Sequence, residues 1–119
     1  MYNIFIVGRV LFGLYFAFSG FNHFKNHAML AGYAASKGVP FPTVSNYIAG
    51  ALLLLGGLGI AFEYQWRLSN VLILIFLIPT TFMIHDFWKD KDPMARQANM
   101  THFLKNVALI GATLMLFAI

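Results

Sequence analysis

The sequence predicts an all-α integral membrane protein, built as an antiparallel bundle of four transmembrane helices. Of the 119 residues, 60% are apolar and only 10% are charged, whereas soluble domains carry about 25% charged residues. Four long apolar runs divide the chain, and only two charged side chains, Arg9 and Lys105, lie inside them. This length allows one domain, residues 1–119, and short connections place both termini at the same end of the bundle.

Each apolar run is long enough, or nearly long enough, to cross a bilayer. A crossing helix needs about 20 apolar residues, because each adds ~1.5 Å and the hydrocarbon is ~30 Å thick. Residues 107–119 alone would cover only ~20 Å, so the last helix has to begin near Thr101 or His102 and to include Lys105 and Asn106. The four predicted spans are residues 4–21, 47–62, 68–84 and 102–119.

The three connections differ in length. The first, residues 22–46, contains the helix-breaking sequence SKGVPFP, and ahead of it residues 27–36 are predicted to form a short helix on the membrane surface. The second, EYQWR, is predicted to be a tight turn. The third belongs to the stretch HDFWKDKDPMARQANMTHFLKN, residues 85–106, which concentrates the charge between two apolar runs.

All four histidines fall at one end of the predicted bundle. His23 and His27 close the first span, His85 ends the third, and His102 opens the last. Such a cluster suggests a metal, haem or proton-handling site. No HExxH-like metal spacing is present and no histidine lies in mid-span, so we expect no metal site there, with His23, His27, His85 and His102 as the only candidate ligands. The alternative is four unrelated histidines at an interface.

Arg9 lies inside the first apolar run. A charge within a span costs roughly 2.5–3.5 kcal/mol on insertion scales and is a functional hypothesis by default. Glu63 ends the second span at the same end of the bundle, so we predict an ion pair between them; the alternative is that Arg9 reaches the headgroups alone. This run also resembles a signal peptide, but no small-x-small cleavage site follows it.

A second polar set lies at the histidine end. Lys105 can reach water along its stem, but Asn106 cannot, and an amide that faces lipid loses its hydrogen bonds. We therefore predict a polar cleft between helices, where a bundle binds small ligands and where a quinone or a lipid headgroup would fit without covalent attachment. Together with Arg9, the candidate ligand-contacting residues are His23, Thr81, His85, His102, Lys105 and Asn106.

Small residues predict which helices pack closely. Gly13, Ala17 and Gly20 share one face of the first span, and Gly50 and Gly57 do the same on the second. Small side chains let membrane helices approach each other. We interpret both faces as packing surfaces.

The basic residues predict the orientation. Arg9 and Arg67 lie at the end that carries the termini, and six Lys and Arg residues lie at the other. The positive-inside rule then makes the first and third connections cytoplasmic and both termini extracytoplasmic. The chain has no cysteine, which removes thiol chemistry, and no basic stripe of the kind that binds nucleic acid.

Several stretches together resemble the DoxX family of small four-helix membrane proteins. They are RVLFGLYFAFSGFNHF, GVPFP, GALLLLGGLGIAF, HDFW and FLKNVALIGATL, in this order over nearly the whole chain. The resemblance implies a plasma (inner) membrane protein associated with quinone-linked redox systems or oxidative-stress complexes. Arg9, Gly13 and Gly20 match the family pattern, and so do His85, Trp88, Lys105 and Asn106. His23 stands where many relatives have Lys, and Leu53 where many have an acidic residue.

Three functions follow from these observations. The leading hypothesis is a membrane subunit or anchor of a quinone-linked oxidoreductase or oxidative-stress complex, without a redox cofactor of its own. The alternatives are a small-molecule or ion permease and a non-enzymatic assembly factor. No self-contained catalytic motif is present, so enzymatic activity is expected at most as part of a complex. The expected partners are the lipid bilayer, a redox-complex protein and a second copy of the chain.

Overall fold

The computed structural model describes all 119 residues, and its regular structure is entirely helical. Four of its helices are long and apolar enough to cross a membrane, which confirms the predicted fold class. A short helix at residues 27–36, between the first two spans, is also present as predicted. The elements are α1 (Tyr2–Lys25), α2 (His27–Ser36), α3 (Pro42–Ala61), α4 (Trp66–Met83), the 3-10 turn η1 (Phe87–Lys89) and α5 (Pro93–Ala118).

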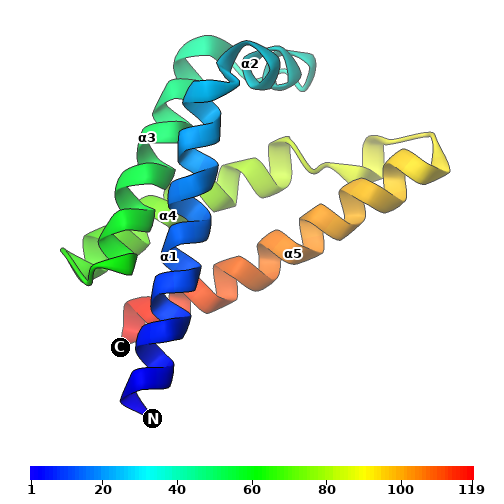
Figure 1. Ribbon diagram of the computed structural model, residues 1–119. Helices are drawn as coiled ribbons and strands as arrows, with labels where there is room; N and C mark the ends of the chain where they lie inside the picture. Colours follow the sequence, from blue (N-terminus) through cyan, green and yellow to red (C-terminus); the bar gives the residue numbers. More distant parts are fainter.

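The spans form two hairpins that diverge from each other. α1 and α3 lie side by side and are connected at one end through α2, while α4 and α5 run together at an incline to them (Figure 1). The two hairpins approach at the end that carries both termini and separate toward α2 and η1 (Figure 1). We refer to these as the terminal end and the histidine end.

The last helix is longer than predicted. It begins at Pro93 rather than near Thr101. Asp92 caps it, since its carboxylate accepts a 3.0 Å hydrogen bond from the Ala95 amide, and proline suits the first helical position because its missing N–H needs no partner there. The added turns are polar, so a prediction based on apolar runs could not include them.

Glycines bring the backbones of α1 and α3 together. A Cβ atom on Gly13 would lie 2.5 Å from the Gly57 carbonyl oxygen and from the Ala61 amide nitrogen, and one on Gly20 would lie 2.5 Å from the Leu54 amide nitrogen. No larger residue fits at such distances from backbone atoms. The predicted packing role of these small residues is confirmed.

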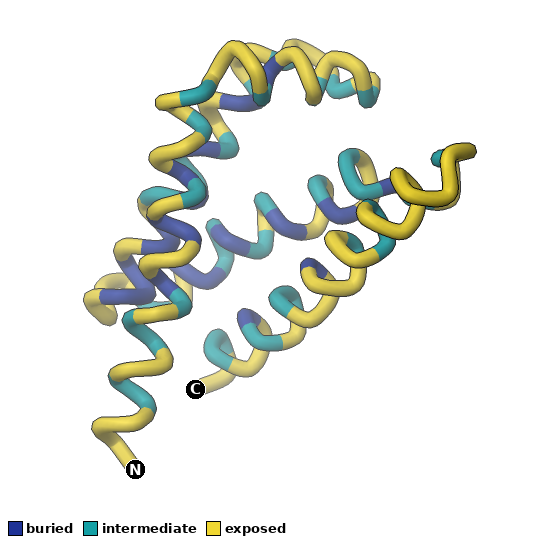
Figure 2. Tube along the Cα trace, turned by 45° about the vertical axis from the view of Figure 1, so that its right-hand side comes forward, coloured by how far each residue is buried: buried dark blue, intermediate teal, exposed yellow.

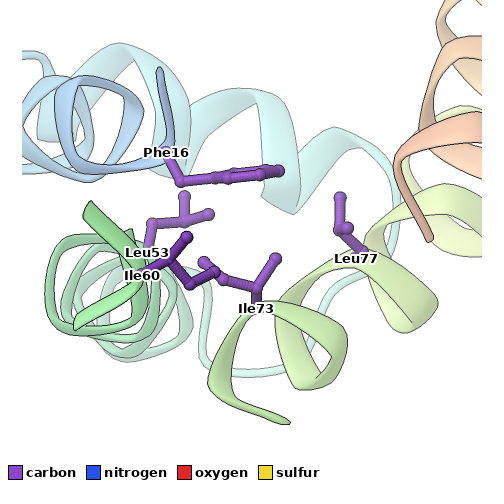
Figure 3. Packing of buried hydrophobic residues seen from close by; sticks show 5 residues of the cluster. All are labelled: Phe16, Leu53, Ile60, Ile73 and Leu77. Atoms are coloured by element: carbon purple, nitrogen blue, oxygen red, sulfur yellow. The ribbon is translucent and has the colours of Figure 1, made fainter. Parts of the chain in front are cut away.

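The apolar core lies where α1, α3 and α4 meet. Its fully buried side chains are Phe16, Leu53, Ile60, Ile73 and Leu77 (Figure 3). α5 contributes no fully buried apolar residue; its two buried side chains are Asn106 and Thr113. Most of its surface is exposed (Figure 2). α5 therefore buries two polar side chains and packs Leu109, Ile110 and Leu116 against the core, while its other apolar residues are mostly exposed, as expected of a helix that faces lipid.

Candidate functional site: a cavity between the two hairpins

The terminal end of the bundle is closed. Arg9 Nη1 lies 2.9 Å from Glu63 Oε2, with 10% of the arginine side chain and 52% of the glutamate side chain exposed. Trp66 Nε1 donates a 2.7 Å hydrogen bond to the Leu116 carbonyl oxygen, and its ring lies 6.4 Å from that of Phe5. These contacts connect α1, the α3–α4 turn, α4 and α5, so the hairpins meet here.

The turn that carries Glu63 has an unusual backbone. Glu63 has φ 57° and Gln65 has φ 46°, and a side chain in this left-handed region costs on the order of 1–3 kcal/mol. The Ser69 hydroxyl donates a 2.8 Å hydrogen bond to the Tyr64 carbonyl and helps to hold the turn. The predicted tight turn is therefore present, and its conformation places Glu63 beside Arg9.

A cavity of about 650 Å³ lies between the hairpins toward the histidine end. This volume falls in the range of ligand pockets, about 300–1,000 Å³. Its walls are mostly apolar and include Phe16, Phe76 and Leu109. A second hollow, of about 730 Å³, follows the outer surface of α1 alone between Leu14 and Lys25. Because one helix alone lines that hollow, we take the cavity between the hairpins as the candidate site.

Four of the predicted site residues line this cavity. They are His23 on α1, His85 after α4, and Lys105 and Asn106 on α5. Asn106 is 5% exposed, so its amide faces the protein interior rather than lipid. Lys105 Nζ lies 3.3 Å from the Tyr15 hydroxyl oxygen, which forms the hydrogen bond between α1 and α5. Two helices and the connection after α4 thus bring polar groups to one space.

The structure places the other predicted residues elsewhere. Thr81 is fully buried and donates a 2.6 Å hydrogen bond to the Leu77 carbonyl; the neighbouring Thr80 lines the cavity instead. One residue turns a helix by about 100°, which moves a side chain to another face. His102 is exposed and does not line the cavity. Its ring stacks on that of His85, with 5.1 Å between the ring centres. Arg9 lies at the opposite, terminal end.

The four histidines do not form a metal centre. No group of three or more His, Asp or Glu side chains lies close enough to hold a metal ion. His23 packs edge-on against Phe76 at 5.8 Å, and His27 lies 5.7 Å from the Tyr47 ring. Only His85 and His102 are neighbours.

Comparison with known proteins agrees with this membrane architecture. The DoxX family model matches residues 4–86, which is well over half of the chain. The chain belongs to the DoxX family. It is 29% identical over 111 residues to the inner membrane protein YphA of Escherichia coli (strain K12), an alignment that covers 93% of this chain and 79% of YphA. No solved structure matches the chain.

The two departures from the DoxX pattern occupy different places. Leu53, for which the family resemblance led us to expect an acidic residue, has no exposed surface and belongs to the apolar core. His23, for which the resemblance led us to expect a lysine, lines the cavity, and its Nδ1 lies 2.9 Å from the Ser19 carbonyl oxygen. Leu53 therefore belongs to the core of this DoxX protein, and His23 belongs to the polar lining of its cavity.

Sequence reasoning missed an ion pair that joins the hairpins at the histidine end. Lys37 Nζ lies 2.7 Å from Asp86 Oδ1, and the two side chains are only 16% and 7% exposed. Lys89 lies further from the same carboxylate, at 3.8 Å. The hydrogen bond to Asp86 raises the pKa of Lys37 above its usual value, so the pair is charged at neutral pH. The sequence feature that could have indicated this pair is Asp86, an acidic residue at the end of the third apolar run.

Sequence reasoning also missed a polar chain behind His85. Asn99 Nδ2 donates a 2.7 Å hydrogen bond to Asp90 Oδ2, and Asn99 Oδ1 lies 3.4 Å from His85 Nδ1. Asn99 belongs to the polar first turns of α5 that the sequence prediction left outside the last span. These turns give the cavity histidine a fixed partner.

Proposed function

We propose that this DoxX-family membrane protein binds a quinone or a similar amphipathic molecule in the cavity between its hairpins, as the membrane subunit of a quinone-linked oxidoreductase. The cavity itself carries the proposal. Its size suits a small organic ligand, its apolar walls suit a ring and an isoprenoid tail, and its few polar groups suit ring oxygens. The electrons come from or go to a separate protein partner.

The side of α1 that faces α5 supports access from the bilayer. Where the hairpins separate, Lys105 and Tyr15 form the hydrogen bond between these two helices. Both side chains of this contact are exposed, and lysine carries its charge on a flexible four-carbon stem. A lipid-soluble molecule can therefore enter sideways past this pair, without passing through water.

Filling the cavity tests the proposal. Leu109 lines the cavity, whereas Leu114 on the same helix is 51% exposed. In lipid nanodiscs, Leu109→Trp should weaken binding of a short-chain ubiquinone at least about tenfold, the effect of losing about 1.4 kcal/mol, and Leu114→Trp should not. Equilibrium dialysis measures both. Absence of quinone binding in the unchanged protein, or equal binding by both variants, would contradict the proposal.

The placement in the membrane is part of the proposal. The relative YphA is named an inner membrane protein, which supports the plasma (inner) membrane. The basic residues, six at the histidine end and two at the terminal end, support extracytoplasmic termini. Reporter fusions to Ile119 measure the side directly, and a strong cytoplasmic-type signal would reverse the orientation.

One observation favours a second candidate, a small-molecule permease. The cavity lies toward one end of the bundle, and the Arg9–Glu63 ion pair helps to close the other. Alternating access would open that end and close the first. Uptake of a quinol analogue or an anion into proteoliposomes, absent in empty vesicles, would favour this function over a binding subunit.

A further inference from the structure

The orientation of the Asn99 amide is fixed by its neighbours. Its Nδ2 donates to the Asp90 carboxylate at 2.7 Å, and a carboxylate only accepts hydrogen bonds. The other atom of the amide, Oδ1, therefore faces His85 Nδ1, at 3.4 Å. An amide oxygen also only accepts, so His85 Nδ1 has to carry the proton.

This arrangement leaves the second ring nitrogen of His85 without a proton in the neutral ring. No protein group hydrogen-bonds to Nε2, and Nε2 is not among the fully buried atoms that lack a partner. His85 itself lines the cavity. Its Nε2 is thus an open acceptor, and the stacked ring of His102, 5.1 Å away, helps to hold the imidazole in place.

The cavity also presents a donor. Lys105 lines it and carries three protons on Nζ. A hydroxyl group both donates and accepts, so hydroxyls on a ligand can satisfy both His85 Nε2 and Lys105. A quinone or ether oxygen only accepts; it can satisfy Lys105 but leaves Nε2 unpaired and removed from water, which weakens binding.

We propose that His85 Nε2 accepts a hydrogen bond from a hydroxyl of the bound molecule, so that the cavity selects a quinol, or another amphipathic alcohol, over its quinone or ether. The inference rests on the proposed function for the location of the ligand and adds the oxidation state that is recognised. Asn99 and Asp90 are positioning residues, because they act through His85.

A matched set of ligands tests this selectivity. Duroquinol, its dimethyl ether and duroquinone share one ring, and calorimetry under anaerobic conditions at pH 8, where imidazole is neutral, measures their binding in nanodiscs. We expect duroquinol to bind at least about tenfold more tightly than the other two. Asn99→Leu and His85→Phe should reduce this preference to within about twofold.

A second measurement reads the tautomer without any ligand. In ¹⁵N-histidine-labelled protein in lipid, solid-state NMR should show His85 with its proton on Nδ1. Asn99→Leu should yield a mixture of tautomers. Asp90→Asn should shift the tautomer population of His85 toward that mixture, because the introduced amide both donates and accepts hydrogen bonds and no longer fixes the orientation of Asn99. Asp92→Asn is the matched control: it removes the same charge from the same loop, retains a helix cap and should leave the tautomer unchanged.

The outcomes separate this inference from the proposed function. Binding of all three ligands with equal affinity, or tighter binding of duroquinone, would overturn the hydroxyl selectivity and leave quinone binding in place. Binding of none of them would overturn both. An Nε2-protonated His85, or a preference that survives Asn99→Leu, would overturn the assigned roles of His85 and Asn99.

Discussion

Each end of the bundle contains an ion pair between segments that are far apart in the sequence, yet the two pairs differ in what surrounds them. At the terminal end, Arg9–Glu63 lies beside the contact of Trp66 with Phe5 and Leu116, and half of the glutamate is exposed. At the histidine end, Lys37–Asp86 is nearly buried and connects hairpins that otherwise separate. Packing holds the terminal end, whereas the histidine end depends on electrostatics around a cavity.

The largest effect is expected from breaking the pair at the histidine end. Lys37→Met leaves the buried Asp86 carboxylate with only the more distant Lys89, and removal of one partner from a buried pair costs about 3–5 kcal/mol. Reversible unfolding in mixed micelles measures the loss. The control, Lys91→Met, changes an exposed lysine of the η1–α5 loop and should have little effect.

A double variant sharpens this result. Lys37→Met with Asp86→Leu removes both charges and should recover most of the stability, because the cost comes from the unpaired buried carboxylate. A double variant as unstable as Lys37→Met alone would show that the pair acts through packing instead.

The next effect concerns the close contact of α1 and α3. A Cβ atom on Gly57 would lie 2.5 Å from the Gly13 carbonyl oxygen, so Gly57→Ala should destabilise the protein by about 1–3 kcal/mol. Gly111 on α5 has no heavy atom within 4 Å of the added position, and Gly111→Ala should be neutral or stabilising. Thermal unfolding in detergent compares them. Equal losses would contradict the assigned contact.

A smaller effect is expected for the pair at the terminal end. Double-mutant cycles of contacting residues give coupling of about 0.5–3 kcal/mol, and the exposure of Glu63 puts Arg9–Glu63 at the low end of that range. The cycle uses Arg9→Leu and Glu63→Leu. Arg67, exposed and without an acidic partner, gives the control cycle with Glu63. Coupling near zero in the first cycle would show that packing alone closes this end.

The smallest effect appears in alkali. Because the folded pKa of Lys37 is raised above 10.5, its contribution to stability is complete below that pH and declines as the pH rises through the folded pKa. Lys37→Arg keeps its charge there and should lose less stability between about pH 10 and 12 than the unchanged protein. Equal declines would assign the alkaline loss to other groups.

Composition and periodicity were sufficient to predict the four spans and the short helix, but not the polar first turns of α5. Long apolar runs have few alternatives in a chain this poor in charge, and the glycine faces of α1 and α3 follow from regular spacing. The contact of Arg9 with Glu63 could be predicted because the first two spans are antiparallel and their lengths place both residues at the same end. The inward orientation of Asn106 could be predicted because a side-chain amide avoids lipid.

The contacts at the histidine end could not be predicted in the same way. The contact of Lys37 with Asp86 joins two connections, and no periodic pattern determines how connections meet. Thr81 was the predicted cleft residue, but Thr80, one position away, lines the cavity instead. The angle between the hairpins, which creates the cavity, depends on packing of whole helices rather than on any single residue.

The small contribution of α5 to the apolar core has a consequence for biosynthesis. All five fully buried core residues, from Phe16 to Leu77, precede the loop that leads into α5. These residues are therefore synthesised before the last helix, whose Leu109, Ile110 and Leu116 pack against them only later. α5 then packs against the earlier helices and supplies Lys105, Asn106 and Leu109 to the cavity lining. A chain interrupted before this helix would keep the five core residues but lack the α5 wall of the cavity, so the binding space requires α5.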